Sequence, residues 1–142
     1  MRIHAKLEIP NIDELMKDCG LDEYGEVQKY IDNFIIEKSE PYMPKKDDIL
    51  IESASIGSRG GLVIWDTPYA QYLYEGKLMV SPTTGSSWAK FGEEKVLASP
   101  SVDLHYHSGD SNRREKWFDR MIDNEMDNLI EGIQNIVNGG KL

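Results

Sequence analysis

Apolar and polar residues alternate over 2–9, and this period of two predicts a half-buried strand at the start of the chain. A short helix is expected over 12–18, closed by Gly20. Apolar residues then recur at helical spacing, which predicts a second helix over 23–38 with Asp22 as its N-cap. The chain therefore begins with one strand and two helices.

The middle of the chain predicts a hairpin followed by a short helix. Residues 49–57 alternate as in a strand, residues 62–65 are apolar and β-prone, and the Ser-Arg-Gly-Gly turn between them permits a tight reversal. Thr67 is followed by a proline, as at the start of a helix. We therefore expect a helix over 68–75 that ends at Gly76.

From residue 77 to 111 the hydrophobic periodicity fades, and glycine, serine, threonine and proline punctuate the chain. Residues 77–80 and 103–107 are candidate strands. Long irregular connections are uncommon in compact domains and usually serve a function. We therefore interpret residues 81–102 as a projecting loop.

The last segment carries the strongest helical pattern. Asn112 with Glu115 three residues later resembles a capping box, and Gly139 and Gly140 end the pattern, so a helix is expected over 112–138. Its predicted apolar stripe contains Phe118, Ile122, Met126, Leu129, Ile133, Ile136 and Val137.

These elements predict one α+β domain over residues 1–142, with helices packed on one face of a small curved antiparallel sheet and a long C-terminal helix. A strand and helices occupy 1–40, the sheet and a short helix 41–80, the irregular loop 81–111 and the final helix 112–138. A chain of 142 residues supports an ordinary core without disulfides or structural metal.

Charge and cysteine content exclude several classes of function. Lysine and arginine number 16 against 25 aspartate and glutamate residues, a net charge of −9 that argues against sequence-specific nucleic-acid binding and against docking on anionic lipid. The single Cys19 permits neither an intramolecular disulfide nor a cysteine zinc site. The N-terminus lacks the apolar core of a signal peptide, so we expect the protein to be made and kept in a cytoplasm unless it leaves as part of something larger.

One cluster is compatible with metal chemistry. Asp103, His105 and His107 alternate, so on a strand they would share a face and could bind zinc. This supports an alternative function, a small metal-dependent hydrolase. Exposed or hydrogen-bonded histidines fit the same pattern. The chain shows no nucleophile elbow or phosphate-binding loop, so we predict no catalytic residues and no cofactor.

Four carboxylates recur every fourth residue along the final helix: Asp119, Asp123, Asp127 and Glu131. Like charges at this spacing destabilise a helix. Three interpretations remain open. The carboxylates form a solvated face, they meet a basic partner surface or repel DNA from a conduit wall, or they mimic nucleic acid toward a DNA-binding protein.

Large side chains outside the periodic patterns are candidates for protein contacts. Trp88 lies in the irregular loop without periodic apolar neighbours, and Trp117 and Met121 fall on the flank of the final stripe. Such residues either tuck under their own loops or serve as interface anchors.

Three segments resemble phage minor capsid proteins that act in head-tail joining and tail completion. They are Pro-Tyr-Met-Pro at 41–44, Val-Ile-Trp-Asp-Thr-Pro-Tyr-Ala-Gln-Tyr-Leu-Tyr-Glu-Gly at 63–76, and Lys-Trp-Phe-Asp-Arg-Met at 116–121. The stretch 44–50 departs from that family, because it lacks the glycine that these proteins typically carry in a turn after the first long helix.

The resemblance implies a small α+β subunit of the virion, without catalytic residues, that assembles as a homo-oligomeric ring at the neck or head-proximal tail end. Its expected partners are the head connector or portal on one side and tail proteins on the other. A closed ring requires head-to-tail contacts between copies. The candidate partner-binding residues are Tyr69, Tyr72, Tyr74, Trp88, Trp117, Asp119, Asp123, Asp127 and Glu131.

Overall fold

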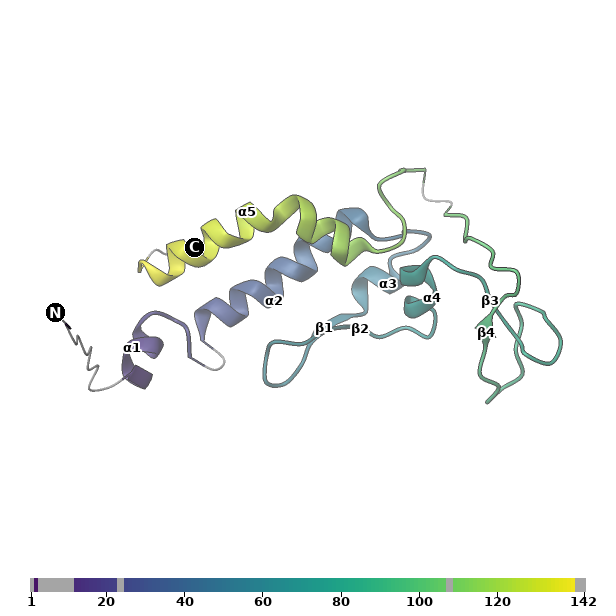
Figure 1. Ribbon diagram of the computed structural model, residues 1–142, viewed down its shortest axis with the longest axis horizontal. Coiled ribbons are helices and arrows are strands. Elements are labelled where there is room, and N and C mark those ends of the chain that lie inside the picture. The colour runs from purple at the N-terminus through teal and green to yellow at the C-terminus, as the bar shows by residue number, and fades with distance from the viewer. Residues whose placement is uncertain (1, 3–11, 23–24, 107–108, 140–142) are drawn as a thin grey trace.

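The computed structural model describes residues 2, 12–22, 25–106 and 109–139. Helices dominate an elongated molecule, and the predicted α+β class is confirmed (Figure 1). The predicted strand over 2–9 lies outside the described residues, apart from Arg2. The elements are α1 (Ile12–Asp18), α2 (Glu26–Ser39), the 3-10 turn η1 (Glu40–Tyr42), α3 (Ile49–Glu52), β1 (Ala54–Ile56), β2 (Val63–Trp65), α4 (Ala70–Glu75), β3 (Met79–Val80), β4 (Val96–Leu97) and α5 (Trp117–Val137).

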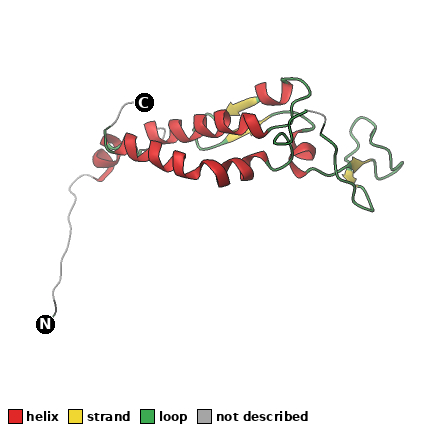
Figure 2. Cartoon of the chain, turned by 90° about the horizontal axis from the view of Figure 1, so that it is seen from above, coloured by secondary structure: helices red, strands yellow, loops and turns green. Residues whose placement is uncertain are grey.

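The two longest helices, α2 and α5, run antiparallel and side by side (Figures 1 and 2). Phe34 of α2 and Met121 and Leu129 of α5 form the buried cluster between them. The helices approach closely where Gly132 faces Tyr30, because a Cβ atom at Gly132 would lie 2.0 Å from the Tyr30 hydroxyl oxygen. This pair is the scaffold on which the rest of the chain packs.

A second buried cluster joins the start of α5 to the hairpin and α4. Met43, Leu50 and Trp117 are its buried members. The Trp117 indole meets the rings of Tyr74 and Trp65 edge-on, with ring centres 4.7 and 6.0 Å apart. Such aromatic pairs stabilise a fold by about 0.5–1.5 kcal/mol beyond their buried area. They fix α4 and the hairpin against α5.

α5 begins later than predicted, and the expected capping box is not formed. Lys116 precedes the helix in the left-handed conformation with a φ of 53°, and its side chain does not cap the first turn. Arg120 instead donates to the backbone carbonyls of Asn112 and Glu115, at 2.9 Å each. These bonds hold the segment before α5 as an irregular turn, which excludes it from the helix.

The buried face of α5 is also rotated from the predicted stripe. Trp117 and Met121, predicted on the flank, are only 2% and 0% exposed, whereas Met126, predicted within the stripe, is 40% exposed. The reason is that α5 packs on α2 along its length and also on the second cluster at its start. The large side chains of Met121 and Trp117 fill these two contacts. The helix end is confirmed by Gly139, with a φ of 79°; Gly140 lies outside the described residues.

The N-terminal helices follow the prediction with one correction. α1 has the predicted bounds, and Gly20 closes it with a φ of 73°. α2 starts at Glu26, after Gly25, and Asp22 does not cap it. The Gly25 N–H donates to the Asp22 carbonyl at 2.9 Å, so Asp22 belongs to a turn before the helix.

The predicted strand over 49–57 is half helix. Residues 49–52 form α3, because the Asp47 carboxylate accepts from the Ile49 N–H at 3.1 Å and starts a turn there. Only β1 remains extended. It pairs with β2 as the predicted antiparallel hairpin, with Ser55 opposite Ile64.

α4 begins two residues later than predicted, after Tyr69, and it ends at Gly76 as predicted, where φ is 70°. The Thr67 side chain does not act as the cap, and its buried hydroxyl has no hydrogen-bond partner among the described residues. Instead the Thr67 carbonyl accepts from the Ala70 N–H at 3.2 Å.

Among the described residues, the strands form two separate two-stranded sheets rather than one sheet. The second sheet pairs β3 with β4 and supports a segment that extends beyond the helical body (Figures 1 and 2). We call residues 81–102 the arm. The predicted strand over 103–107 is reduced, within the described residues, to one bridge between Asp103 and Lys77; His107 is not described.

Candidate interaction surfaces

The arm exposes large aromatic side chains at its tip. Trp88 is 86% exposed and Phe91 is fully exposed. Val96, Leu97 and Val102, nearer the base, are about half exposed. Exposed apolar groups that gather in one segment mark interaction sites, whereas scattered ones do not. The interpretation of Trp88 as tucked under its own loop is therefore wrong, and that of an interface anchor remains a prediction.

Polar contacts around one buried serine give the arm a defined shape. The Ser81 side chain is 1% exposed, and its hydroxyl donates to the Glu93 carboxylate at 2.5 Å. Glu93 also accepts from the Lys90 N–H at 3.0 Å. These two bonds, the Ser81 hydroxyl first, lower the pKa of Glu93 from its ordinary value. The aromatic tip is therefore presented on a closed loop whose ends are tied together.

The three predicted contact tyrosines of α4 have different environments. Tyr69 lies just before α4 and is 36% exposed. Tyr72 is half-buried, and the Lys95 ammonium lies 5.7 Å from its ring centre, which ties the arm to α4. Tyr74 packs on Trp117, and burial together with a hydrogen bond to Asp119 raises its pKa to about 12. Only Tyr69 is well placed for an external contact.

Trp117 is a correction to the predicted contact set. Its side chain is 2% exposed, so it belongs to the core and offers no surface to a partner. Helical periodicity assumes one buried face, but the start of α5 is covered both by α2 and by the second buried cluster. The prediction therefore placed Trp117 on the flank.

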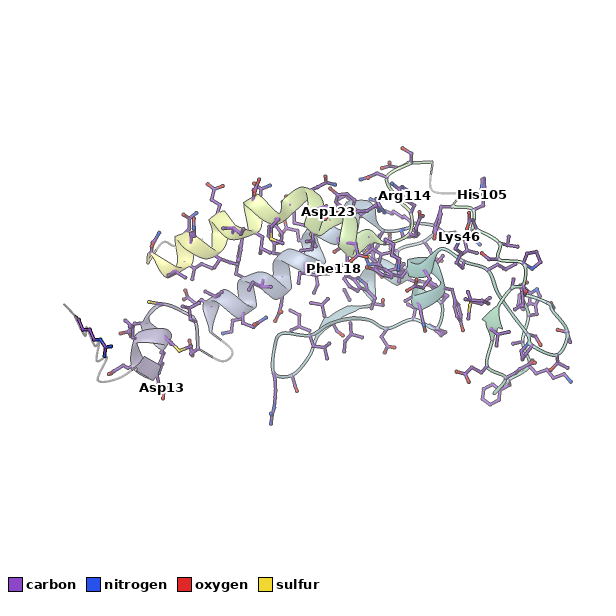
Figure 3. The ribbon with its side chains drawn as sticks, viewed as in Figure 1. Asp13, Lys46, His105, Arg114, Phe118 and Asp123 are labelled. Atoms are coloured by element: carbon purple, nitrogen blue, oxygen red, sulfur yellow. The ribbon has the colours of Figure 1, made fainter. Side chains whose placement is uncertain are left out.

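The four carboxylates of α5 that recur every fourth residue, in contrast, are all on the surface. Asp119, Asp123, Asp127 and Glu131 are exposed, and Figure 3 shows Asp123 on the outer side of the helix. We call these four carboxylates the acidic ridge. They lie on the surface of α5, and their role as a contact stays a prediction.

A groove of about 400 Å³ lies beside α3. Its apolar bed includes Ile49, which is 57% exposed, together with Leu50, Tyr69 and Leu73. Lys46 and His105 both line the groove (Figure 3). We call this the α3 groove. A larger groove of about 460 Å³ runs between α2, β2 and the start of α5.

The predicted metal cluster is brought together only in part. Asp103 forms an ion pair with Lys77, His105 lines the α3 groove, and His107 lies outside the described residues. Within the described ranges, no three His, Cys, Asp or Glu side chains are grouped so that they could hold a metal ion.

Sequence reasoning missed Phe91, Ile49 and Lys46 as surface candidates. Phe91 stands three residues after Trp88 in the same non-periodic stretch, so it carried the same signal. Ile49 was concealed by the strand prediction, which placed it in a sheet.

Comparison with protein-family models, with curated proteins and with solved structures found no match for this chain. None of the described helices has the length and apolar character needed to cross a membrane.

Proposed function

We propose that this chain is a structural subunit of a phage virion, a minor capsid or neck protein that acts in head-tail joining or tail completion by assembling as a ring. The observation that carries the proposal is the arm. It is ordered by its own polar bonds, yet Trp88 and Phe91 are left in water. Exposing two large aromatic side chains on a fixed loop costs solubility and is useful when a partner covers them.

The three segments that resemble phage minor capsid proteins support the same function, and they pack together in this fold. Pro-Tyr-Met-Pro and Lys-Trp-Phe-Asp-Arg-Met meet in the second buried cluster through Met43 and Trp117. The tyrosine segment forms α4 and packs on that cluster through Tyr74. The residues that carry the resemblance therefore contribute to one buried cluster of the helical body.

Electron microscopy of phage particles tests the proposal. A phage whose gene for this subunit is interrupted should yield filled heads and separate tails, and a plasmid copy of the gene should restore complete virions. A copy with Trp88→Ala and Phe91→Ala should not restore them, whereas a copy with Leu62→Ala and Ile130→Ala, two other exposed apolar residues, should. Complete virions in normal yield without the subunit would contradict the proposal.

Metal analysis of the purified protein addresses the hydrolase alternative. Stoichiometric zinc that is lost when His105 and His107 are changed to alanine would favour an enzyme over a structural subunit. The structural proposal expects both proteins to contain no stoichiometric metal.

A further inference from the structure

The α3 groove and the arm are complementary in chemistry but separate within one chain. The arm leaves the body after β3 and returns past the groove, which His105 and Tyr106 line. Its tip does not fold back, because Trp88 remains 86% exposed. A surface that is used only between copies has this arrangement.

The size of the groove fits the tip of the arm. Its volume of about 400 Å³ lies within the usual range for sites that enclose large organic side groups. Ile49, at 57% exposure, and Tyr69, at 36%, leave an apolar bed open to solvent. The Trp88 indole and the Phe91 phenyl ring are the most exposed apolar groups on the arm, ahead of Val96, Leu97 and Val102.

Charges beside the tip match charges at the groove edge. Lys90 directly precedes Phe91 in sequence, Glu94 follows it by three residues, and both are exposed. At the groove, Lys46 and Asp47 are exposed and stand next to each other in sequence. Within the described part of the chain, neither Lys90, Glu94 nor Lys46 forms an ion pair. The positive Lys90 on the arm therefore has the negative Asp47 available at the groove, and the negative Glu94 has the positive Lys46.

We propose that the arm of one copy inserts Trp88 and Phe91 into the α3 groove of a second copy. Lys90 then faces Asp47, and Glu94 faces Lys46. The two surfaces are different patches of the molecule, so the contact is head to tail and repeats from copy to copy, as ring closure requires. This inference rests on the proposed ring assembly and names the surfaces that form it.

The contact is small, which has a consequence for when the ring forms. Two aromatic side chains bury about 300–500 Å² between them, against about 800 Å² per partner in a standard stable interface. Copies should therefore stay separate in dilute solution and join where a connector gathers them, since tethering raises the local concentration.

Disulfide trapping tests the contact directly. In a Cys19→Ser background, Ser87→Cys places a thiol beside Trp88, and Lys45→Cys places one at the groove edge. Mixing the two purified variants should give a cross-linked dimer that neither variant gives alone. Equal cross-linking of the Ser87→Cys variant with itself, or none in the mixture at any concentration, would overturn the proposal.

Charge reversal tests the register. Lys46→Glu and Glu94→Lys should each lower the cross-linked yield, and Lys46→Glu on one partner with Glu94→Lys on the other should restore it. Trp88→Ala with Phe91→Ala should weaken association at least about tenfold. The pair Leu62→Ala and Ile130→Ala, two exposed apolar residues outside the arm, should not. Failure of the double reversal to restore cross-linking would overturn the pairing.

The two proposals fail separately. If the purified variants do not cross-link but the phage with the interrupted gene yields unjoined heads, the arm contact is wrong and the virion role stands. If the purified variants cross-link but the phage without this subunit yields normal virions, the virion role is wrong and the arm contact stands. Circular dichroism checks the fold of each variant, and no change is expected because the substituted arm side chains are exposed.

Discussion

Gly132 is the residue on which the helix pair depends most directly. A Cβ atom there would lie within 2.7 Å of three atoms of the Tyr30 ring and hydroxyl, so the ring would have to move. We expect Gly132→Ala to lower the free energy of unfolding by about 1–3 kcal/mol through overpacking, which exceeds the roughly 1 kcal/mol gained from helix propensity. Urea denaturation measures the change.

A second background separates the two effects at Gly132. With Tyr30→Ala the obstruction is removed, and Gly132→Ala should then stabilise the protein by up to about 1 kcal/mol. Asn135→Ala, on the exposed side of the same helix, is the control. An unchanged urea midpoint for Gly132→Ala in the natural sequence would show that the helices do not approach as described.

Two tyrosines make the fold sensitive to alkali. Burial first, and then the Asp119 carboxylate for Tyr74 and the Glu115 carboxylate for Tyr106, raise both pKa values from 10.0 to about 12. Their stabilising contribution is complete below pH 10 and is lost as the pH rises toward 12, because the unfolded chain ionises first.

Urea denaturation across this range should show a falling midpoint. Tyr106→Phe loses the 2.7 Å bond that its hydroxyl donates to the Leu73 carbonyl and should cost about 0.5–1.5 kcal/mol near neutrality. Together with Tyr74→Phe it should flatten the alkaline slope. A slope that the double variant leaves unchanged would contradict the assignment.

Among the elements, the arm depends on one buried hydroxyl. Ser81→Ala removes the donor to Glu93 and should speed amide exchange over residues 82–93 while leaving α2 and α5 protected. Acid should act in the same way. The pKa of Glu93 is lowered by this bond, so the arm is stabilised above the ordinary value of 4.5 and loses that support as the pH falls through the folded pKa.

Pro82→Ala, beside Ser81 and exposed, is a matched control that keeps the hydroxyl. Exchange that is equally slow in the Ser81→Ala variant would mean that other contacts order the arm.

An element can be predicted from the sequence when neighbouring residues determine it, and it is missed when other contacts determine it. α1, the end of α4 at Gly76 and the end of α5 at Gly139 were predicted, because glycine and local spacing determine them. The start of α5 was not predicted, because it depends on hydrogen bonds from the Arg120 side chain to the carbonyls of Asn112 and Glu115, which helical spacing does not reveal. The short α3 was missed for a similar reason, since an aspartate side chain overrides the alternating pattern.

The surfaces were predictable to a lesser degree. The acidic ridge follows from spacing alone, and it lies on the exposed side of α5. Trp88 could be singled out because it stands in a segment without periodicity. The burial of Trp117 and the α3 groove could not, because both arise where elements distant in sequence meet.

At the scale of the whole molecule, the arm and the helical body should be thermodynamically separate. Replacing residues 82–94 with Asn-Gly joins β3 to β4 through a two-residue turn that favours hairpins. Because the core clusters contain no residue of the arm, the melting temperature should change by no more than a few degrees. Calorimetry measures this, and loss of cooperative melting would show that the arm belongs to the core.

The same shortened chain should fail to restore virions, whereas its helix content should match that of the natural protein. A shortened chain that restores virions would separate the arm from head-tail joining.

The brevity of β3 and β4 has a consequence for how copies can meet. Each strand contributes two residues, so the free edges display few amide and carbonyl groups. Long, flat edges recruit further strands without limit and lead to fibres. The exposed rings of Trp88 and Phe91 lie on a ribbon that is too short to template such growth. In the proposed ring, copies would therefore join through side chains alone, and the assembly could close after one turn.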